Sequence, residues 1–250
     1  MNIALIGYGQ MGQRIEELSK ETETSISLIL DEHNNEDGEG ITEESMSEVD
    51  VAIDFSHPDA FVINAEKVLQ TGTPLVIGTT GWLDRIKDIG ARCKKAGTPV
   101  IYGSNFSLGV QLFAKLMRKA GELFGGSELF DEVLHEVHHT RKADAPSGTA
   151  YTLVDQYLEG GKQDRKIEYG IPEEGRVDKD RFYVTSQRLG SVFGEHQLRI
   201  NSEYDDITLT HQARSRDAFA SGALQAARWI VNQQPGFYKL EDVVADVVQT

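Results

Sequence analysis

The 250 residues include 25 basic and 40 acidic side chains, which gives a formal net charge of −15. Such a charge repels nucleic-acid phosphates and anionic lipid, so neither is expected as a partner. No apolar stretch approaches the roughly 20 residues that span a bilayer, and the first four residues lack the basic residues of a signal peptide. We therefore expect a cytoplasmic protein. The lone cysteine, Cys93, can form no internal disulfide and is expected to have no catalytic role.

Short β-branched runs alternate with helical patterns through the first hundred residues. The expected strands are residues 3–6, 26–30, 51–55, 75–77 and 100–102. The expected helices are residues 10–20, 59–70 and 82–96. Apolar strands joined by helical crossovers are typical of a parallel sheet, so we predict an α/β fold with a Rossmann-like, doubly wound sheet. Ser56 is expected to cap a helix that begins at Pro58.

The pattern changes from about residue 107. A helix to residue 124, a strand at 133–137 and a helix at 149–158 precede three segments that alternate polar and apolar residues, namely 181–187, 195–201 and 206–211. Such alternation favours antiparallel strands, so we predict an α+β second domain with a mixed or antiparallel sheet. A final amphipathic helix at 217–231 is expected to return to the first domain. The predicted domains are residues 1–106 with 217–250, and residues 107–216.

A glycine motif follows the first predicted strand and opens the first predicted helix. It consists of Gly7, Tyr8, Gly9, Gln10, Met11 and Gly12. In this context, glycines permit a tight turn and the free N–H groups of a helix N-terminus receive a pyrophosphate. Asp31 ends the second strand about 20 residues later, where a carboxylate binds the ribose hydroxyls of a dinucleotide. The sequence therefore predicts a nicotinamide dinucleotide site.

Two further turns close the fourth and fifth predicted strands. They are Gly78-Thr79-Thr80-Gly81 and Gly103-Ser104-Asn105-Phe106. Ligands of open α/β sheets bind at the carboxyl ends of strands, so these turns are candidates for the nicotinamide half of the cofactor. Ordinary connecting turns remain an equal alternative for either one alone.

Residues 136–150 concentrate chemically active side chains. His138, His139, Arg141 and Lys142 precede a Ser147-Gly148-Thr149 turn. In an acidic chain this cluster favours a small dianionic substrate, and an imidazole or amine can deliver the proton that must accompany a hydride. One of the two histidines, or the lysine, could instead be an ordinary polar residue. The spacing provides no third metal ligand, so no metal is expected.

The pattern E-x-H-H-x-x-K-x-D-A-P-S-G-T-A, read from residue 136 to residue 150, resembles the signature of the dihydrodipicolinate reductases. Further similarity extends along the whole chain. It covers the N-terminal glycine loop and residues 53–56, 78–81, 105–107, 188–190, 194–196, 211–216 and 219–224.

The resemblance implies a reaction and an assignment of roles. The family removes water from a hydroxylated cyclic imine dicarboxylate and reduces the ring to tetrahydrodipicolinate, with NADH or NADPH, in lysine and diaminopimelate biosynthesis. His138 would be the general acid, assisted by Lys142. The substrate carboxylates would be held by His139, Ser147, Gly148 and Thr149. The cofactor would lie on residues 7–12, Asp31, residues 78–80 and residues 103–106. The second domain would bind substrate and join a homotetramer.

One departure bears on the cofactor. The family's glycine loop usually has one more residue and an arginine where Gln10 stands here, and that arginine would favour a 2′-phosphate. Glu32, His33 and Asn34 follow Asp31 without a lysine or arginine. We therefore predict that NADH is preferred over NADPH, with Arg14 as the residue best able to rescue NADPH binding.

Two rival functions compete with this interpretation. Another two-domain reductase, such as an acylating or sugar dehydrogenase, would need a nucleophilic cysteine in a turn or a Glu-Lys-Pro motif, and neither is found. A non-catalytic NAD-sensing module would use residues 138–149 as an interface. Only the chemistry of that loop separates these possibilities, because the fold is shared.

Overall fold

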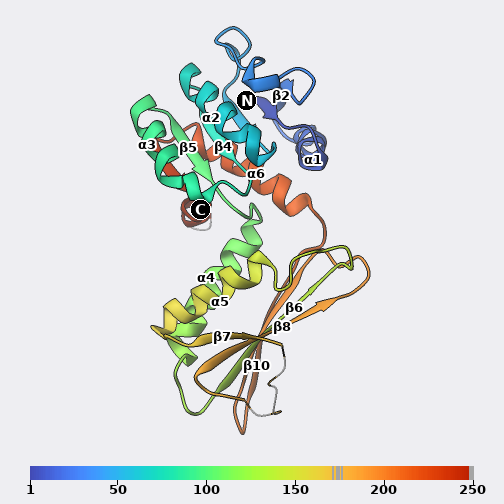
Figure 1. The fold of residues 1–250 in the computed structure, drawn as a ribbon, viewed down its shortest axis with the longest axis vertical. Helices are drawn as coiled ribbons and strands as arrows, with labels where there is room; N and C mark the ends of the chain where they lie inside the picture. The colour runs from blue at the N-terminus through green and yellow to red at the C-terminus, as the bar shows by residue number, and fades with distance from the viewer. Residues whose placement is uncertain (171, 173–174, 176, 248–250) are drawn as a thin grey trace. The chain divides into compact units, whose positions relative to one another are not determined.

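The computed structural model describes residues 1–170, 172, 175 and 177–247, and the chain forms two compact units (Figure 1). One unit comprises Met1–Leu108 with the segment that begins at Asp217, and the other comprises Gly109–Arg216. Within the described part of the chain, no helix is both long and apolar enough to cross a membrane.

The described strands of the first unit form one parallel sheet of six, in the order β11-β5-β4-β3-β1-β2. They are β1 (Asn2–Ile6), β2 (Ser25–Leu30), β3 (Val51–Asp54), β4 (Leu75–Ile77), β5 (Pro99–Tyr102) and β11 (Gly236–Lys239). The chain passes from β1 to β2 on one side and then to β3 on the other. The carboxyl ends of β1 and β3 therefore flank the point where the strand order reverses, which is where such sheets bind ligands.

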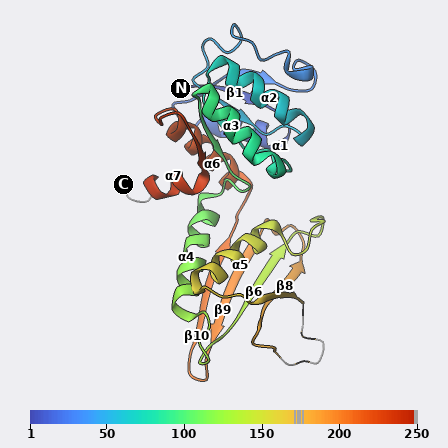
Figure 2. The ribbon, with the colours of Figure 1, turned by 60° about the vertical axis from the view of Figure 1, so that its left-hand side comes forward.

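Helices cover both faces of this sheet (Figure 2). They are α1 (Gln10–Ser19), α2 (Pro58–Thr71), α3 (Ile86–Ala96), α6 (Asp217–Ile230) and α7 (Leu240–Val247). Successive side chains of a strand point to opposite faces. Ile3 accordingly packs in a core with α1 and α6, whereas Ala4 packs in a second core with α2 and α3. This two-sided burial explains why the strands are apolar throughout, and it confirms the predicted doubly wound sheet.

The second unit pairs a mixed sheet with two helices, as predicted. Its described strands lie in the order β10-β9-β6-β8-β7. They are β6 (Asp131–His138), β7 (Lys166–Tyr169), β8 (Arg181–Arg188), β9 (Glu195–Asn201) and β10 (Asp206–Gln212), and the helices are α4 (Leu108–Phe124) and α5 (Gly148–Gly161). Alternate strand residues such as Leu134 and Leu198 form one core with Phe113 of α4 and Leu153 of α5, so both helices lie on one face (Figure 2).

The antiparallel prediction is right for β9 and β10 but wrong for residues 181–187. Strand β8 runs parallel to both of its neighbours, β6 and β7. The alternation of polar and apolar residues indicates only that one face of the strand is buried. A parallel and an antiparallel strand can both show this pattern. The crossover through α5 returns the chain so that β7 runs in the direction of β6, and β8 pairs parallel to both.

The predicted helix at 82–96 is also corrected. Trp82 is buried and donates its indole N–H to the carbonyl of Thr79 at 2.7 Å, while its ring packs on Phe61 with 4.8 Å between centroids. These contacts hold Trp82 outside the helix, so a 3₁₀ turn at Leu83–Arg85 precedes α3. Ser56, expected as a cap, donates its hydroxyl to Asp54 instead, and the His57 side chain caps α2.

Cys93 lies fully buried on α3 in the core beneath the sheet. Burial raises the pKa of its thiol to about 11. The thiol therefore stays protonated at neutral pH, which suits a packing role.

Candidate active site

The glycine loop is a tight turn between β1 and α1. Gly7 adopts a φ of +91°, and a Cβ atom there would lie 2.4 Å from the carbonyl oxygen of Phe55. Only glycine allows this conformation with the β1 and β3 loops in such close contact. The glycine loop therefore lies in close contact with the loop that follows β3, at the point where the strand order reverses.

The N-terminus of α1 carries no side-chain cap. Gly9 precedes the helix without a side-chain cap, and no acidic residue occupies the first turn, which begins at Gln10. Such a terminus attracts a phosphate group. Met11 packs against the core of the first unit and Gly12 is buried. These two residues, which were predicted to bind the cofactor, therefore pack the loop onto the core.

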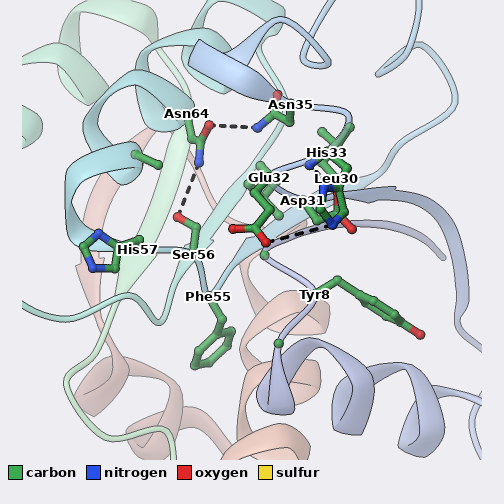
Figure 3. Close-up of a pocket in the computed structure, with 14 residues that line it drawn as sticks. Tyr8, Leu30, Asp31, Glu32, His33, Asn35, Phe55, Ser56, His57 and Asn64 are labelled. Atoms are coloured by element: carbon green, nitrogen blue, oxygen red, sulfur yellow. Dashed lines mark hydrogen bonds and ion pairs between the residues drawn. The ribbon is translucent and has the colours of Figure 1, made fainter.

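A pocket of about 430 Å³ opens beside this loop (Figure 3). Its lining includes Gly7, Tyr8, Gly9 and Asp31, all predicted from the sequence. The Asp31 carboxylate is held in place because it accepts the N–H of His33 at 2.9 Å. The lining also includes four polar residues that were not predicted for the site, namely Asn35, Ser56, His57 and Asn64, and two that were considered only for the 2′-phosphate, Glu32 and His33.

A buried carboxylate ties the β3 and β4 loops together beneath the pocket. Asp54 accepts hydrogen bonds from the Ser56 hydroxyl at 2.8 Å and the Thr79 hydroxyl at 2.6 Å. Burial raises the pKa of Asp54, and the hydrogen bonds oppose that shift. Asn64 extends the network from Ser56 to Asn35 (Figure 3). A polar residue within the apolar stripe of α2 was the sequence signal for this network.

The residues predicted for the nicotinamide half are brought together only in part. A small pocket of about 20 Å³ is lined by Thr79, Thr80, Gly103 and Ser104 among others. Gly78 lies against the Phe55 ring. Asn105 accepts the N–H of Ser107 at 3.0 Å, and the Phe106 side chain is buried in the core of the first unit. The side chain of Phe106 therefore has a packing role.

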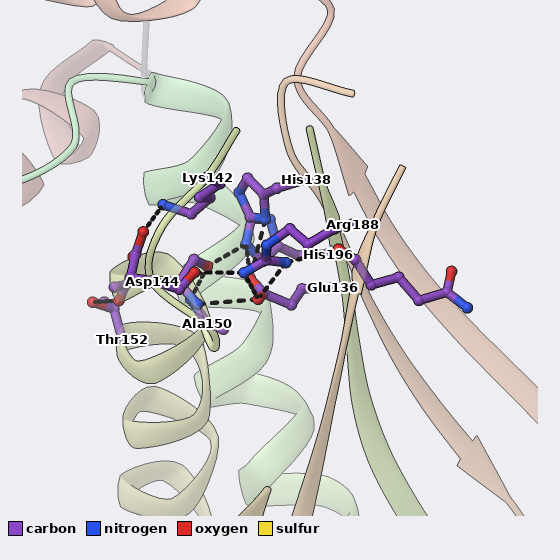
Figure 4. A network of polar contacts seen from close by, with 11 residues as sticks. Glu136, His138, Lys142, Asp144, Ala150, Thr152, Arg188 and His196 are labelled. Atoms are coloured by element: carbon purple, nitrogen blue, oxygen red, sulfur yellow. Dashed lines mark hydrogen bonds and ion pairs between the residues drawn. The ribbon is translucent and has the colours of Figure 1, made fainter. Parts of the chain in front are cut away.

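In the second unit, the end of β6 carries a buried polar network (Figure 4). The Oε2 atom of Glu136 lies 3.2 Å from Nδ1 of His138, an ion-pair distance although the two groups are not ideally aligned. The Ser147 N–H donates to Oε1 of Glu136 at 3.1 Å. Arg188 at the end of β8 approaches the same oxygen at 3.3 Å. His196 of β9 lies 3.3 Å from the Ser147 hydroxyl.

The charges in this network follow from burial and hydrogen bonding. Burial raises the pKa of Glu136, but the nearby His138 imidazole and the Ser147 N–H outweigh it, so the net pKa lies well below the usual range. Burial is also the main reason that the pKa of His196 falls to about 3. At neutral pH the network thus holds an ionised Glu136 and a neutral His196.

The predicted substrate-binding residues gather at the start of α5. Ser147 caps the helix by accepting the N–H of Ala150 at 3.1 Å, and Gly148 and Thr149 form its first turn. Lys142 pairs with Asp144 at 2.7 Å beside this turn (Figure 4). His139 follows the end of β6, and the pKa of its imidazole is lowered by burial and by nearby cations such as Arg141. A cationic loop therefore adjoins a helix N-terminus.

Three members of this network had no assigned role in the sequence analysis. Glu136, Arg188 and His196 fall within the motifs that carry the family resemblance, and this was the available signal. Glu136, His138 and His196 also place possible metal ligand atoms within 4.8 Å of one another, which sequence spacing did not reveal. The guanidinium of Arg188 contacts the same carboxylate and makes a cation unfavourable there. A metal-free site stays a prediction.

The doubly wound sheet with its glycine turn, together with the polar network of a second unit, defines a dinucleotide-binding reductase. Family models for the dihydrodipicolinate reductase N-terminus and C-terminus match residues 1–106 and 109–244. A 4-hydroxy-tetrahydrodipicolinate reductase of Christiangramia forsetii is 40% identical over 248 residues, covering 99% of both chains. One from Methanopyrus kandleri is 40% identical over 201 residues, covering 79% of this chain and 72% of that protein.

The structure is also similar to solved ones. A dipicolinate-bound dihydrodipicolinate reductase from Paenisporosarcina sp. TG-14 gives a TM-score of 0.77 at 24% identity, covering 97% of this chain and 98% of the other. An amine dehydrogenase from Mycobacterium smegmatis gives 0.62 at 10% identity, covering 96% and 95%, so it shares the fold. The chain belongs to the dihydrodipicolinate reductase family. The predicted resemblance and the predicted oxidoreductase class are confirmed.

Proposed function

We propose that this protein reduces 4-hydroxy-tetrahydrodipicolinate, after loss of water, to tetrahydrodipicolinate, with NADH as the preferred donor. The observation that carries the proposal is the arrangement in the second unit. His138, which lies beside an ionised Glu136, and Lys142 adjoin the N-terminus of α5. A dianionic ring would find cations and N–H donors there, and a proton donor close by.

The residues of the first unit fit a dinucleotide. The pyrophosphate would lie at the uncapped start of α1, and the Asp31 carboxylate would accept hydrogen bonds from the ribose hydroxyls. Bound NADH would supply the hydride. Residues 78–80 and 103–106 remain the proposed neighbours of the nicotinamide.

The residues of the second unit would then bind and protonate the substrate. Lys142, His139 and the Ser147–Gly148–Thr149 turn would hold its two carboxylates. His138 would donate the proton that completes reduction of the ring. The assignment of the second unit to substrate binding and to a homotetramer, and the cytoplasmic location, stay predictions.

The function is tested by supplying the cyclic substrate to the purified protein and following NADH oxidation. We expect steady turnover that depends on both compounds. Protein that binds NADH without oxidising it would favour the sensing module, and turnover with another carbonyl or imine substrate alone would favour a different reductase.

The preference for NADH is a separate prediction. Asp31 and Glu32 line the pocket of the first unit without a lysine or arginine among its lining residues, so a 2′-phosphate would face two carboxylates. Arg14, the expected rescuer, is paired with Asp217 and Glu17 and is not free to serve. If the two carboxylates repel the 2′-phosphate by about 1.4 kcal/mol, kcat/KM is roughly tenfold higher with NADH than with NADPH.

A charge reversal at the pocket checks the reason for the preference. Glu32→Arg is expected to raise kcat/KM for NADPH and to leave that for NADH little changed. The control is Glu43→Arg, which makes the same charge change at an exposed residue that does not line the pocket. A clear NADPH preference of the unchanged protein would contradict the prediction.

A further inference from the structure

Glu136 lies under the proposed proton donor as a fully buried, ionised carboxylate. Its Oε1 atom accepts the N–H of Ser147 and contacts Arg188, and its Oε2 atom is directed at His138. The Ser147 N–H and the Arg188 contact hold the carboxylate in one place. Glu136 is therefore a stationary negative charge beside one nitrogen of the imidazole.

The two ring nitrogens of His138 have different surroundings. Nδ1 lies 3.2 Å from the Glu136 carboxylate, which can only accept a hydrogen bond. Nε2 lies on the opposite side of the ring, near Gly194, where an added Cβ atom would be 3.0 Å away. Glycine at residue 194 thus leaves the space beside Nε2 open. The hydrogen of the neutral ring is expected on Nδ1, because a carboxylate close to one nitrogen favours the tautomer that carries hydrogen on that nitrogen.

The other charged and titratable groups around His138 come from four elements. Arg188 of β8 contributes a positive charge, and Lys142 adds another from the loop. His139 follows at the end of β6, and His196 of β9 packs edge-on with 5.2 Å between ring centroids. His196 is neutral at pH 7 because its pKa is about 3. Glu136 thus places a negative charge beside Nδ1 of His138 among these positive and neutral neighbours.

We propose that Glu136 is a positioning residue that holds His138 with Nδ1 protonated, so that Nε2 is the atom that delivers the proton to substrate. This inference rests on the proposed function. In the step, the Nε2–H bond of the imidazolium breaks and a bond forms from that proton to the ring atom that becomes electron-rich as the neighbouring atom accepts hydride. His138 is left neutral, with its remaining proton on Nδ1 facing Glu136, and it regains the other proton from water.

The first test compares Glu136→Gln with Glu132→Gln. Glu132 is a matched control because it is also a buried carboxylate on β6 paired with an arginine, Arg165. In Glu136→Gln the neutral amide no longer stabilises the imidazolium, so the pH above which kcat falls is expected to move down by about one unit or more. At pH 8 kcat is then expected to fall about tenfold, whereas dipicolinate and NADH still bind. Glu132→Gln is expected to keep the original profile.

The second test needs neither activity nor a variant of Glu136. Ring ¹⁵N spectra of the protein, with the His138 signals identified by their loss in His138→Gln, should show Nδ1–H and unprotonated Nε2 at high pH. The opposite tautomer would overturn the inference even in an active enzyme. An unchanged pH profile in Glu136→Gln would overturn it as well. Absence of turnover by the unchanged protein would instead reject the proposed function, while the spectra would still report on the geometry.

Discussion

Replacing His138 by glutamine is expected to lower kcat by about 10²- to 10⁴-fold, the usual contribution of a positioned general acid. The substitution keeps a polar side chain of similar length, and its amide can still donate a hydrogen bond to Glu136, so folding should be preserved. It removes the imidazole that is proposed to donate the proton to the substrate. The loss corresponds to about 3–5 kcal/mol in the activation barrier.

His135→Gln is the matched control for His138→Gln. His135 lies on the same strand and interacts with the Thr185 hydroxyl at 2.7 Å, away from the Glu136 network. Steady-state NADH oxidation should be nearly normal in this variant. Titration with NADH and with dipicolinate should give unchanged affinities in both variants. If His138→Gln retained near-normal kcat, another residue would have to be the proton donor.

Replacing Lys142 by alanine is expected to lower kcat/KM for the dicarboxylate by about 10- to 100-fold, because a hydrogen bond to a charged group contributes about 1.5–3 kcal/mol. The lysine is only partly exposed and is paired with Asp144 at 2.7 Å. Substrate binding would thus exchange one carboxylate partner for another. We expect weaker dipicolinate binding, less dependence of that binding on salt, and an unchanged KM for NADH.

Lys119→Ala provides the comparison for Lys142→Ala. Lys119 is paired with Glu122 at the same distance of 2.7 Å but lies on the exposed side of α4. Loss of this pair should leave kcat/KM within about twofold, as is usual for a surface ion pair. An equal fall in both lysine variants would indicate a general effect of net charge. A rise in KM for NADH alone would place Lys142 at the cofactor instead.

The sequence allowed most of the first unit to be predicted because local signals suffice there. Apolar runs such as that of β3, the glycine loop at Gly7 and the acidic residue Asp31 each act through their neighbours in the chain. The unpredicted strands β7 and β11 are short and partly polar, so they lack such a signal. Their strand conformation depends on pairing with β8 and β5.

The sequence by itself determined the family, the class of chemistry and the loop at residues 136–150, because these depend on residue type and order. Only the tertiary structure decided what surrounds His138. Glu136 is two residues away, but Arg188 and His196 come from strands β8 and β9, which pair with β6 from opposite sides. Burial lowers the pKa of His196, and hydrogen bonds from distant elements keep Glu136 ionised. These shifts depend on desolvation and distance, which arise only when separate segments pack together.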